Sequence, residues 1–534
     1  MKLGRIVSTI LGTMLVLSLM LAWGGSATLA SAKAGGILND YFGEDPGTFD
    51  VQADTTLAVY GLAREIFNTL VRYKEATLEL EPELLAKMPE ISKDGLVYTF
   101  ELRQGVKFHD GKTELTSEDV KFTIERMLGP VGLSKWLFDP IKGAAEFISG
   151  KAASVSGITI VDKYHFRITL AKPYAPFLAN LAVPSASIYS RKLVTEAGDK
   201  WAHGPVGTGP FKLKSYIPNT EIVLAKNPDY FEKGLPYLDG INYRVIGDYT
   251  TALMEFESGN LDVIGVPSEA EERQRLLNTG KYELLKSTPL ATYYFSFNMS
   301  DPAWKDVRLR KAFAMCIDKQ AIIDSIWGGD AVVATSFVTP GIPGAFEMGK
   351  GPALPYDPEK ARKLVQELKA GGKPVKCEAW QRGGTGLSDT NIAMQEMAKQ
   401  VGIELNVVLT ERAAFGEARS KGTVPANYGN WWADIPDPDN YLYTYFHPTE
   451  MMSTQYRNDK VTKLLEEAKV ETDPRVRARK YQEAETIIIR DDCAIVPLLH
   501  PIDLLLVQKN VHGVIMHPTG VNSYKHTWKD APGR

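Results

Sequence analysis

The chain has 534 residues, of which 44% are hydrophobic, 24% are charged and 10% are aromatic. This composition is typical of a folded globular protein, and it excludes a disordered chain, a collagen-like repeat and a protein with many membrane spans. The 61 Lys and Arg residues nearly balance the 65 Asp and Glu residues, and the formal charge of −4 gives no indication of nucleic acid binding.

The N-terminus has the pattern of a secretory signal peptide. Lys2 and Arg5 precede an apolar run from Ile6 to Trp23, and the small residues Ala30-Ser31-Ala32 follow as a cleavage motif. A membrane anchor is the alternative, because the apolar run is near the lower length limit for a span. Since the first cysteine is Cys316, no cysteine is placed for lipid attachment. We predict that the segment is cleaved and that the mature protein is free in the periplasm.

The first half of the mature chain is rich in predicted strands. Alternating apolar residues predict a strand over 98–102, and a hairpin is predicted to pair residues 157–161 with 165–170. Between these strands, Thr116 and Asp119 form a capping box that predicts the start of a helix. The helix has an apolar stripe at Val120, Ile124, Met127 and Leu128.

Helices dominate from about residue 302 onward. They are predicted over 309–316, from Pro358 onward and over 461–468, and the strands predicted at 403–409 and 494–499 are interleaved with them. Alternation of helices and strands indicates an α/β architecture, here in two lobes. We find no fixed-period repeat and no long Gly/Ser/Pro linker, so we expect strands or short segments to join the lobes.

The three cysteines resemble core residues. Cys316 lies on the apolar face of the helix predicted over 309–316, and both Cys377 and Cys493 adjoin apolar stretches that resemble strands. We expect three buried and unreactive thiols. One intramolecular disulfide is the alternative.

Glycine motifs that could bind phosphate do not fit their patterns. Five residues separate Gly105 from Gly111, whereas a phosphate-binding loop requires four. The stretch Gly207-Thr208-Gly209 is followed by Pro210 and a strand-like segment, so the helix of a dinucleotide-binding fingerprint is missing. We interpret the stretch as a tight structural turn.

Motifs for catalysis are also missing from the sequence. It contains neither a G-x-S-x-G elbow nor an H-E-x-x-H helix. His512 and His517 are five residues apart, a spacing that would put them on different faces of a helix, so we expect no metal site there. We therefore predict a protein that is not an enzyme and that has no cofactor. A secreted hydrolase is the competing hypothesis.

Three long blocks together resemble one known family. They are residues 94–127, which read DGLVYTFELRQGVKFHDGKTELTSEDVKFTIERM, residues 204–213, which read GPVGTGPFKL, and residues 430–442, which read NWWADIPDPDNYL. Each is similar to a block of the family 5 extracytoplasmic solute-binding proteins, the peptide and nickel binding components of ABC importers. The resemblance extends from about Gly36 to His526.

The resemblance implies a two-lobed periplasmic-binding-protein fold, or Venus flytrap, with an extra strand-rich subdomain in the first lobe. The expected division is a signal peptide over 1–32, lobe I over 33–289, lobe II over 290–499, and a C-terminal return to lobe I over 500–534. Lobe closure around a ligand would be the working motion. The implied partners are a short peptide and the permease subunits of an ABC transporter, and we expect a monomer that is not embedded in the membrane.

The resemblance also implies two charged ligand-binding residues. Asp434 matches the aspartate that holds the α-ammonium of a peptide, and Arg382 matches an arginine that holds its α-carboxylate. A zwitterion in a dry cleft needs an opposite charge at each end. The sequence departs from the pattern of the peptide-binding members at two places. Glycines follow Arg382, and an isoleucine, Ile435, follows Asp434. Asp434 could instead cap a helix, and Arg382 could be an exposed loop residue.

Two tryptophans complete the candidate site. Trp431 and Trp432 would point to opposite faces of a strand, so we expect one of them to face the cleft. Tyr441, Tyr443 and Tyr445 are interpreted mainly as core residues. Nickel chelates, haem, opines, glutathione and oligosaccharides remain alternative ligands for the same fold.

Overall fold

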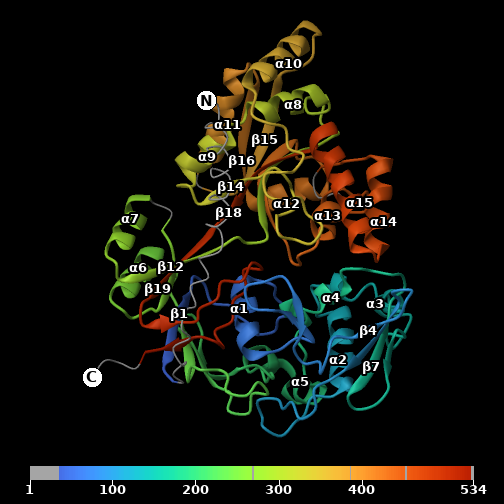
Figure 1. Ribbon diagram of the computed structural model, residues 1–534, viewed down its shortest axis with the longest axis vertical. Coiled ribbons are helices and arrows are strands. Elements are labelled where there is room, and N and C mark those ends of the chain that lie inside the picture. The colour runs from blue at the N-terminus through green and yellow to red at the C-terminus, as the bar shows by residue number, and fades with distance from the viewer. Residues whose placement is uncertain (1–34, 268–269, 385, 451–453, 531–534) are drawn as a thin grey trace, which may run out of the picture.

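The computed structural model describes residues 35–267, 270–384, 386–450 and 454–530, so the predicted signal peptide lies outside the described residues. Two lobes lie one above the other along the longest axis of the molecule (Figure 1). The first lobe contains the N-terminal half and the C-terminal segment of the described chain, and the second lobe contains the part between them. The predicted two-lobed α/β fold is confirmed.

The first lobe is built on two sheets. The main sheet has the order β1-β10-β9-β8, with β1 parallel to β10 and the other pairs antiparallel. A smaller antiparallel sheet has the order β11-β19-β12. The strands are β1 (Ile37–Phe42), β8 (Phe211–Ile217), β9 (Glu221–Lys226), β10 (Gly240–Val245), β11 (Val263–Gly265), β12 (Tyr282–Ser287) and β19 (Asp503–Gln508).

A strand-rich subdomain lies beside these sheets, on the right of the lower lobe in Figure 1. Its sheet has the order β4-β5-β7-β6, and its hydrophobic core is separate from the core of the main sheet. The predicted hairpin is confirmed, with Ile158 paired to Ile168. Its elements are β4 (Glu90–Ile91), β5 (Val97–Glu101), β6 (Ile158–Ile160), β7 (His165–Thr169), α2 (Ser117–Leu128), α3 (Ala144–Ile148) and α4 (Phe177–Asn180).

The capping box predicted for α2 is present. The backbone N–H of Thr116 donates to the Asp119 carboxylate at 2.9 Å, and the threonine hydroxyl donates to the same oxygen at 2.8 Å. All four residues of the predicted apolar stripe are buried at 1% exposure or less. The helix therefore begins where its local side-chain chemistry directs and packs through the face that its periodicity predicts.

The second lobe contains one mixed sheet with the order β14-β18-β13-β17-β15-β16. Strand β15 is parallel to β16 and to β17, whereas β13 is antiparallel to both of its neighbours. Strand β18 is buried along its whole length, in agreement with its continuous apolar run. The strands are β13 (Ala291–Phe297), β14 (Ala331–Val333), β15 (Lys376–Arg382), β16 (Glu404–Thr410), β17 (Ala426–Trp432) and β18 (Ile495–Pro501).

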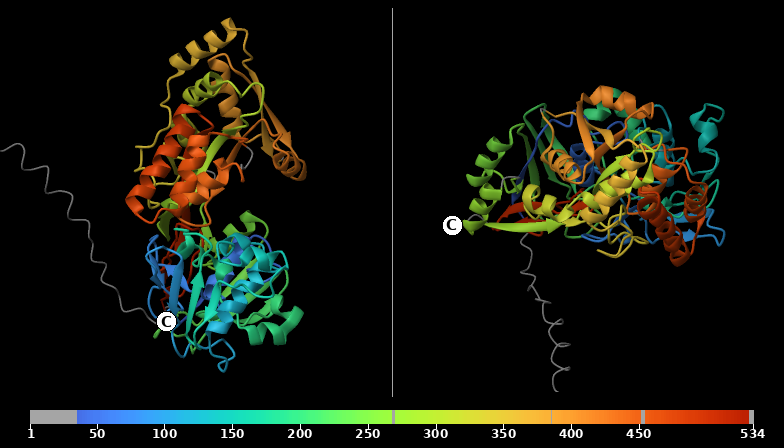
Figure 2. Two further views of the ribbon diagram at one scale, coloured as in Figure 1. Left: turned by 90° about the vertical axis from the view of Figure 1, so that its right-hand side faces the viewer. Right: turned by 90° about the horizontal axis from the view of Figure 1, so that it is seen from above.

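Helices cover both lobes (Figure 2). In the first lobe they include α1 (Leu57–Ile66), α5 (Arg191–Ala197), α6 (Tyr249–Glu257) and α7 (Ala270–Asn278), and the short strands are β2 (Val71–Tyr73), β3 (Leu80–Pro82), β20 (Val511–His512) and β21 (Trp528–Lys529). In the second they are α8 (Val307–Cys316), α9 (Lys319–Ile326), α10 (Pro358–Ala370), α11 (Asp389–Gln400), α12 (Arg412–Ser420), α13 (Asp439–Phe446), α14 (Asp459–Val470) and α15 (Pro474–Thr486). No helix of the described residues is long and apolar enough to cross a membrane.

Two short segments carry the chain between the lobes. Residues 288–290 connect β12 of the first lobe to β13 of the second, and Ile502 connects β18 back to β19. In the first lobe β12 pairs with β19, and in the second lobe β13 pairs with β18. The two connecting segments therefore have paired strands at both of their ends. The connection therefore has no long flexible tether.

The glycine stretch 207–209 is packed against the end of α1. A Cβ atom on Gly207 would lie 1.9 Å from the carbonyl oxygen of Ile66, and one on Gly209 would lie 2.4 Å from that of Glu65. No side chain fits at either position. These glycines allow two backbone segments to approach closely, which agrees with a structural turn.

All three cysteines are free thiols buried in the second lobe. Cys316 lies on α8, Cys377 on β15 and Cys493 just before β18. Burial raises the pKa of Cys316 and of Cys493 to about 12 and raises the pKa of Cys377 as well. The expectation of unreactive core thiols agrees with these positions.

Candidate ligand-binding cleft

A cavity of about 300 Å³ lies between the two lobes. We call it the cleft cavity. The second lobe contributes Trp432, the last residue of β17, and Ala433 and Asp434, which follow it. The first lobe contributes residues from α1, from β2 and from three further segments, and these are Thr55, Leu57, Tyr60, Arg64, Tyr73, Ala182, Val183, Pro184, Thr519 and Val521. The volume is at the lower end of the range for small-molecule sites.

Among the residues that the structure describes, Asp434 is the only acidic residue that lines the cleft cavity. Its side chain is open to the cavity, although surrounding protein raises the pKa of the carboxyl by desolvation. Asn440 holds it, accepting a hydrogen bond from the Asp434 backbone N–H at 3.1 Å and donating to the carboxylate at 3.5 Å. No cation of the described residues forms an ion pair with Asp434, so the carboxylate is available to a positively charged ligand group.

Asp434 does not cap a helix. Helix α13 begins at Asp439, and its N-cap residue is Pro438. The other two carboxylates of the WWADIPDPDN block are buried and have structural partners: Asp437 is bound by Arg477, and Asp439 accepts a hydrogen bond from the Tyr481 hydroxyl at 3.0 Å. Of the three carboxylates in this block, only Asp434 faces the cavity.

The two tryptophans point in different directions. Trp432 is 38% exposed and lines the cleft cavity. Trp431 is half-buried and packs edge-on against Tyr445, with ring centroids 5.2 Å apart. The strand alternation of β17 thus brings one indole ring to the cavity and the other to the hydrophobic core of the second lobe.

Arg382 is not brought to the cleft cavity. It is the last residue of β15, its side chain is exposed, and it forms no ion pair with a described residue. Because β15 and β17 are parallel neighbours, Arg382 at the end of β15 and Asp434 just after β17 lie at the same edge of the sheet. Burial raises the pKa of the Tyr294 hydroxyl, and the positive charge of Arg382 opposes this rise only slightly.

Gln381 anchors the glycine-rich loop that follows Arg382. Its side-chain oxygen accepts hydrogen bonds from the Ser388 backbone N–H at 2.7 Å and from the Asn391 amide at 2.8 Å. Its amide nitrogen donates to the Gly386 carbonyl at 2.9 Å. Gly383 and Gly384 have φ angles of 65° and 103°, which other residues rarely adopt. The loop is therefore held at the start of α11.

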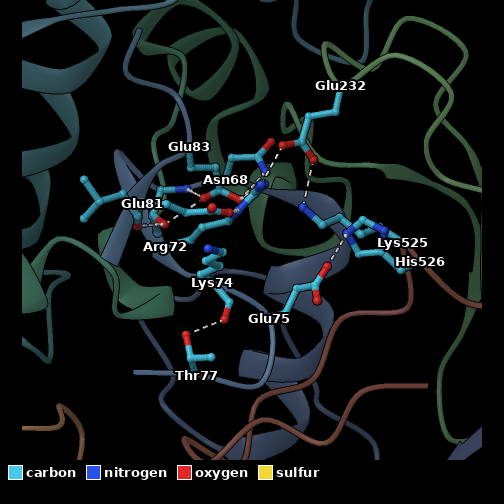
Figure 3. Close-up of polar contacts among 12 residues, drawn as sticks. Asn68, Arg72, Lys74, Glu75, Thr77, Glu81, Glu83, Glu232, Lys525 and His526 are labelled. Atoms are coloured by element: carbon cyan, nitrogen blue, oxygen red, sulfur yellow. Dashed lines mark hydrogen bonds and ion pairs between the residues drawn. The ribbon is translucent and has the colours of Figure 1, made fainter. Parts of the chain in front are cut away.

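A second cavity of about 460 Å³ adjoins the cleft cavity inside the first lobe. We call it the first-lobe cavity. Arg64, Tyr73 and Val521 line both cavities. An ion-pair network lines its far side, where Arg72 binds Glu81 at 2.8 Å and Glu232 at 2.7 Å (Figure 3). The lining also includes Asn68, Lys74, Glu75, Glu83, Pro210, Tyr230, Leu235, Ile515, His517, Ser523, Lys525 and His526.

The first-lobe side of the cleft was not predicted from the sequence. Arg64 is one of 61 Lys and Arg residues, and its spacing from other residues forms no motif that indicates a binding site. Tyr73 and Val521 are 448 positions apart and meet only because the C-terminal segment returns to the first lobe. No group of three or more His, Cys, Asp or Glu in the described part of the chain is arranged to hold a metal ion.

The match to a family model covers residues 79–453, and the family is described as bacterial extracellular solute-binding proteins, family 5. The chain belongs to this family. Haem-binding protein A of Haemophilus influenzae is 29% identical over 487 residues, which cover 86% of each chain. The dipeptide-binding protein of Escherichia coli is 27% identical, over 90% of this chain and 92% of that protein.

Solved structures of the family show the same fold. The periplasmic binding protein DppA from Helicobacter pylori, in complex with the peptide STSA, is 30% identical, with a TM-score of 0.73 over 93% of this chain and 99% of that chain. The murein tripeptide binding protein MppA, in its unliganded open form, has a TM-score of 0.78 at 22% identity over 93% of this chain and 97% of that chain. The family 5 resemblance of the three sequence blocks is confirmed.

Proposed function

We propose that this family 5 protein captures short peptides in the periplasm by lobe closure and delivers them to the permease of an ABC importer. The observation that carries the proposal is the Asp434 carboxylate, which lines a cavity between two lobes and has no cationic partner among the described residues. A peptide ammonium would supply the missing positive charge. The dipeptide-binding protein of E. coli and the peptide complex of the H. pylori protein support this ligand class.

The remaining assignments follow from the same proposal. Arg382 would hold the peptide carboxylate, since a guanidinium can grip a carboxylate through two hydrogen bonds and the sheet edge places both residues on one side of the lobe. Trp432 would pack against the peptide in the cleft, with Trp431 supporting it from the core side. The expected boundary between residues 289 and 290 would stand, and the boundary expected between residues 499 and 500 would move to Ile502, because β18 extends to Pro501. The protein would act by binding alone, after cleavage of residues 1–32.

Calorimetry with a panel of dipeptides tests the proposal. Removing one partner of a buried charge pair costs about 3–5 kcal/mol, which corresponds to roughly a hundredfold to several-thousand-fold in affinity. We expect Asp434→Ala to lose measurable peptide binding and to keep the thermal stability of the wild type. Asp199→Ala, which removes an exposed carboxylate of the first lobe, serves as a matched control. Unchanged affinity in Asp434→Ala would contradict the assignment.

A non-peptide ligand is the second candidate, and the match to haem-binding protein A favours haem among these ligands. Titration with haem, followed by its absorption spectrum, separates the two candidates. Binding of haem together with no heat from any dipeptide would favour the alternative. Binding of dipeptides that an excess of haem does not displace would favour the peptide proposal.

A further inference from the structure

The guanidinium of Arg64 lies where the cleft cavity meets the first-lobe cavity, and it is short of partners. Arg64 is in the last turn of α1 and donates one hydrogen bond, at 2.8 Å, to the carbonyl oxygen of Ala182. No carboxylate of the described residues forms an ion pair with it. An arginine has five N–H donors, and the hydrogen bond to Ala182 uses one of them.

The hydroxyl of Tyr73 is also without a partner. Tyr73 is only 7% exposed, lines both cavities, and its buried oxygen forms no hydrogen bond with a described residue. Its hydroxyl is close enough to Arg64 for the positive charge to act on it electrostatically. A buried polar atom of this kind costs free energy unless something outside the protein satisfies it. The Ser523 hydroxyl on the same first-lobe cavity is likewise unpartnered.

The neighbouring carboxylates Glu83 and Glu65 act on Arg64 electrostatically, but no ion pair joins either of them to Arg64 among the described residues. Glu83 accepts hydrogen bonds from Asn68 at 2.9 Å and from the Thr69 backbone N–H at 2.7 Å. Glu232 is bound by Arg72 at 2.7 Å and by Lys525 at 2.8 Å, as Figure 3 shows. The local arrangement therefore has an unsatisfied cation and an unsatisfied hydroxyl next to a network that is internally paired.

We propose that Arg64 and Tyr73 form a carboxylate-binding subsite beside Asp434, which selects peptides whose first residue is acidic. The inference rests on the proposed peptide-binding function, because it takes Asp434 as the site of the ligand ammonium. Arg64 and Asp434 line the same cavity of about 300 Å³, so a ligand that pairs with both must present an anionic group near its ammonium group. A side-chain carboxylate on the first residue meets this condition. A side-chain carboxylate on the second residue lies farther from the ligand ammonium.

Matched peptides test the position and the charge of the acidic group. Affinities are measured by calorimetry for Glu-Ala and Gln-Ala, which differ at the first residue, and for Ala-Glu and Ala-Gln, which differ at the second. A charge-assisted pair of hydrogen bonds predicts that the wild type binds Glu-Ala roughly tenfold to a hundredfold more tightly than Gln-Ala. The ratio for Ala-Glu and Ala-Gln is expected to be near one.

Three variants test the residues. In Arg64→Gln the ratio of the affinities for Glu-Ala and Gln-Ala is expected to fall to about one, and Arg64→Lys should retain part of it, because it keeps the charge without the bidentate geometry. Tyr73→Phe should reduce the ratio without a loss of thermal stability, because the removed hydroxyl has no protein partner. Arg167→Gln, at an exposed arginine of β7, is the matched control and should keep the full ratio.

The outcomes separate this inference from the proposed function. Equal binding of Glu-Ala and Gln-Ala by the wild type would overturn the carboxylate subsite and leave peptide binding intact. Retention of the full preference in Arg64→Gln would also overturn the subsite. Failure of all four peptides to bind the folded wild type would overturn the proposed function, and the subsite with it.

Discussion

The guanidinium of Arg477 donates two hydrogen bonds, each of 2.8 Å, to the two carboxylate oxygens of Asp437. Both side chains are only 12% exposed. Asp437 is three residues from Asp434, which has no such partner and faces the cleft cavity. Two carboxylates of one sequence block therefore have different roles, one in the stability of the second lobe and one in the proposed binding of ligand.

This difference predicts opposite results for two similar substitutions. Asp437→Asn should lower the free energy of unfolding by about 3–5 kcal/mol, because it leaves the Arg477 charge buried without its partner. Asp434→Asn should leave the stability within about 0.5 kcal/mol of the wild type, because that carboxylate has no cationic partner to lose. Urea denaturation of both variants gives the comparison. Equal stabilities of the two variants would contradict the assignment of roles.

Peptide affinity is expected to fall in acid because of Asp434. Burial raises the pKa of its carboxyl above the ordinary value of 3.8, and only the ionised form can bind an ammonium. As the pH falls through this raised pKa, the carboxylate is protonated and affinity is lost at a higher pH than for an ordinary aspartate. Affinity should be measured from about pH 6.5 to pH 4.5 with an unmodified dipeptide, because its α-ammonium and its α-carboxylate both stay charged over this range. A flat profile would exclude Asp434 as the ammonium ligand.

Glu65 should make folding stability dependent on pH. Burial raises its pKa from 4.5 to about 8, and its side chain accepts a hydrogen bond from the Tyr524 backbone N–H at 2.7 Å. The folded state keeps a proton that the unfolded chain releases, so this stability is fully present below pH 4.5 and is lost as the pH rises to about 8. One such group changes the unfolding free energy by about 1.4 kcal/mol per pH unit.

The test compares the pH dependence of unfolding in Glu65→Gln with that of the wild type. The variant cannot lose this proton, so its stability should decline less steeply between pH 5 and pH 8. Glu146→Gln changes an exposed glutamate of α3 and should keep the slope of the wild type. The same slope in all three proteins would show that Glu65 is ionised in the folded state at neutral pH.

The three thiols should be inert until the protein unfolds. Because burial raises the pKa of Cys316, Cys377 and Cys493, almost no thiolate forms at pH 8 in the folded state. A thiol reagent such as dithionitrobenzoate should therefore label no cysteine in native buffer and all three in guanidinium chloride. Rapid labelling of the native protein, or labelling of only one cysteine after denaturation without reductant, would contradict this arrangement.

Much of the fold could be predicted from local chemistry. The capping box of Thr116 and Asp119, the alternation in β7 and the apolar run in β18 each depend on neighbouring residues, and all three are present. The site could be predicted only in part. Asp434 could be proposed because it lies in a long recognisable block, and it lines the cleft cavity, whereas Arg64 and Tyr73 reach the cleft through packing between distant segments. Arg382 was placed by the same resemblance, and it lies at the sheet edge outside the cleft cavity.

The order in which the strands of the first lobe join has a consequence for folding of the chain. Strand β19 lies between β11 and β12 in its sheet, but it is made only after every strand of the second lobe. All six strands of the second lobe are consecutive from β13 to β18, so that lobe can complete its sheet first. A chain truncated before Asp503 would thus have an intact second lobe and an open gap in the first. Interrupted synthesis should therefore leave the edges of β11 and β12 unpaired, and such edges promote aggregation.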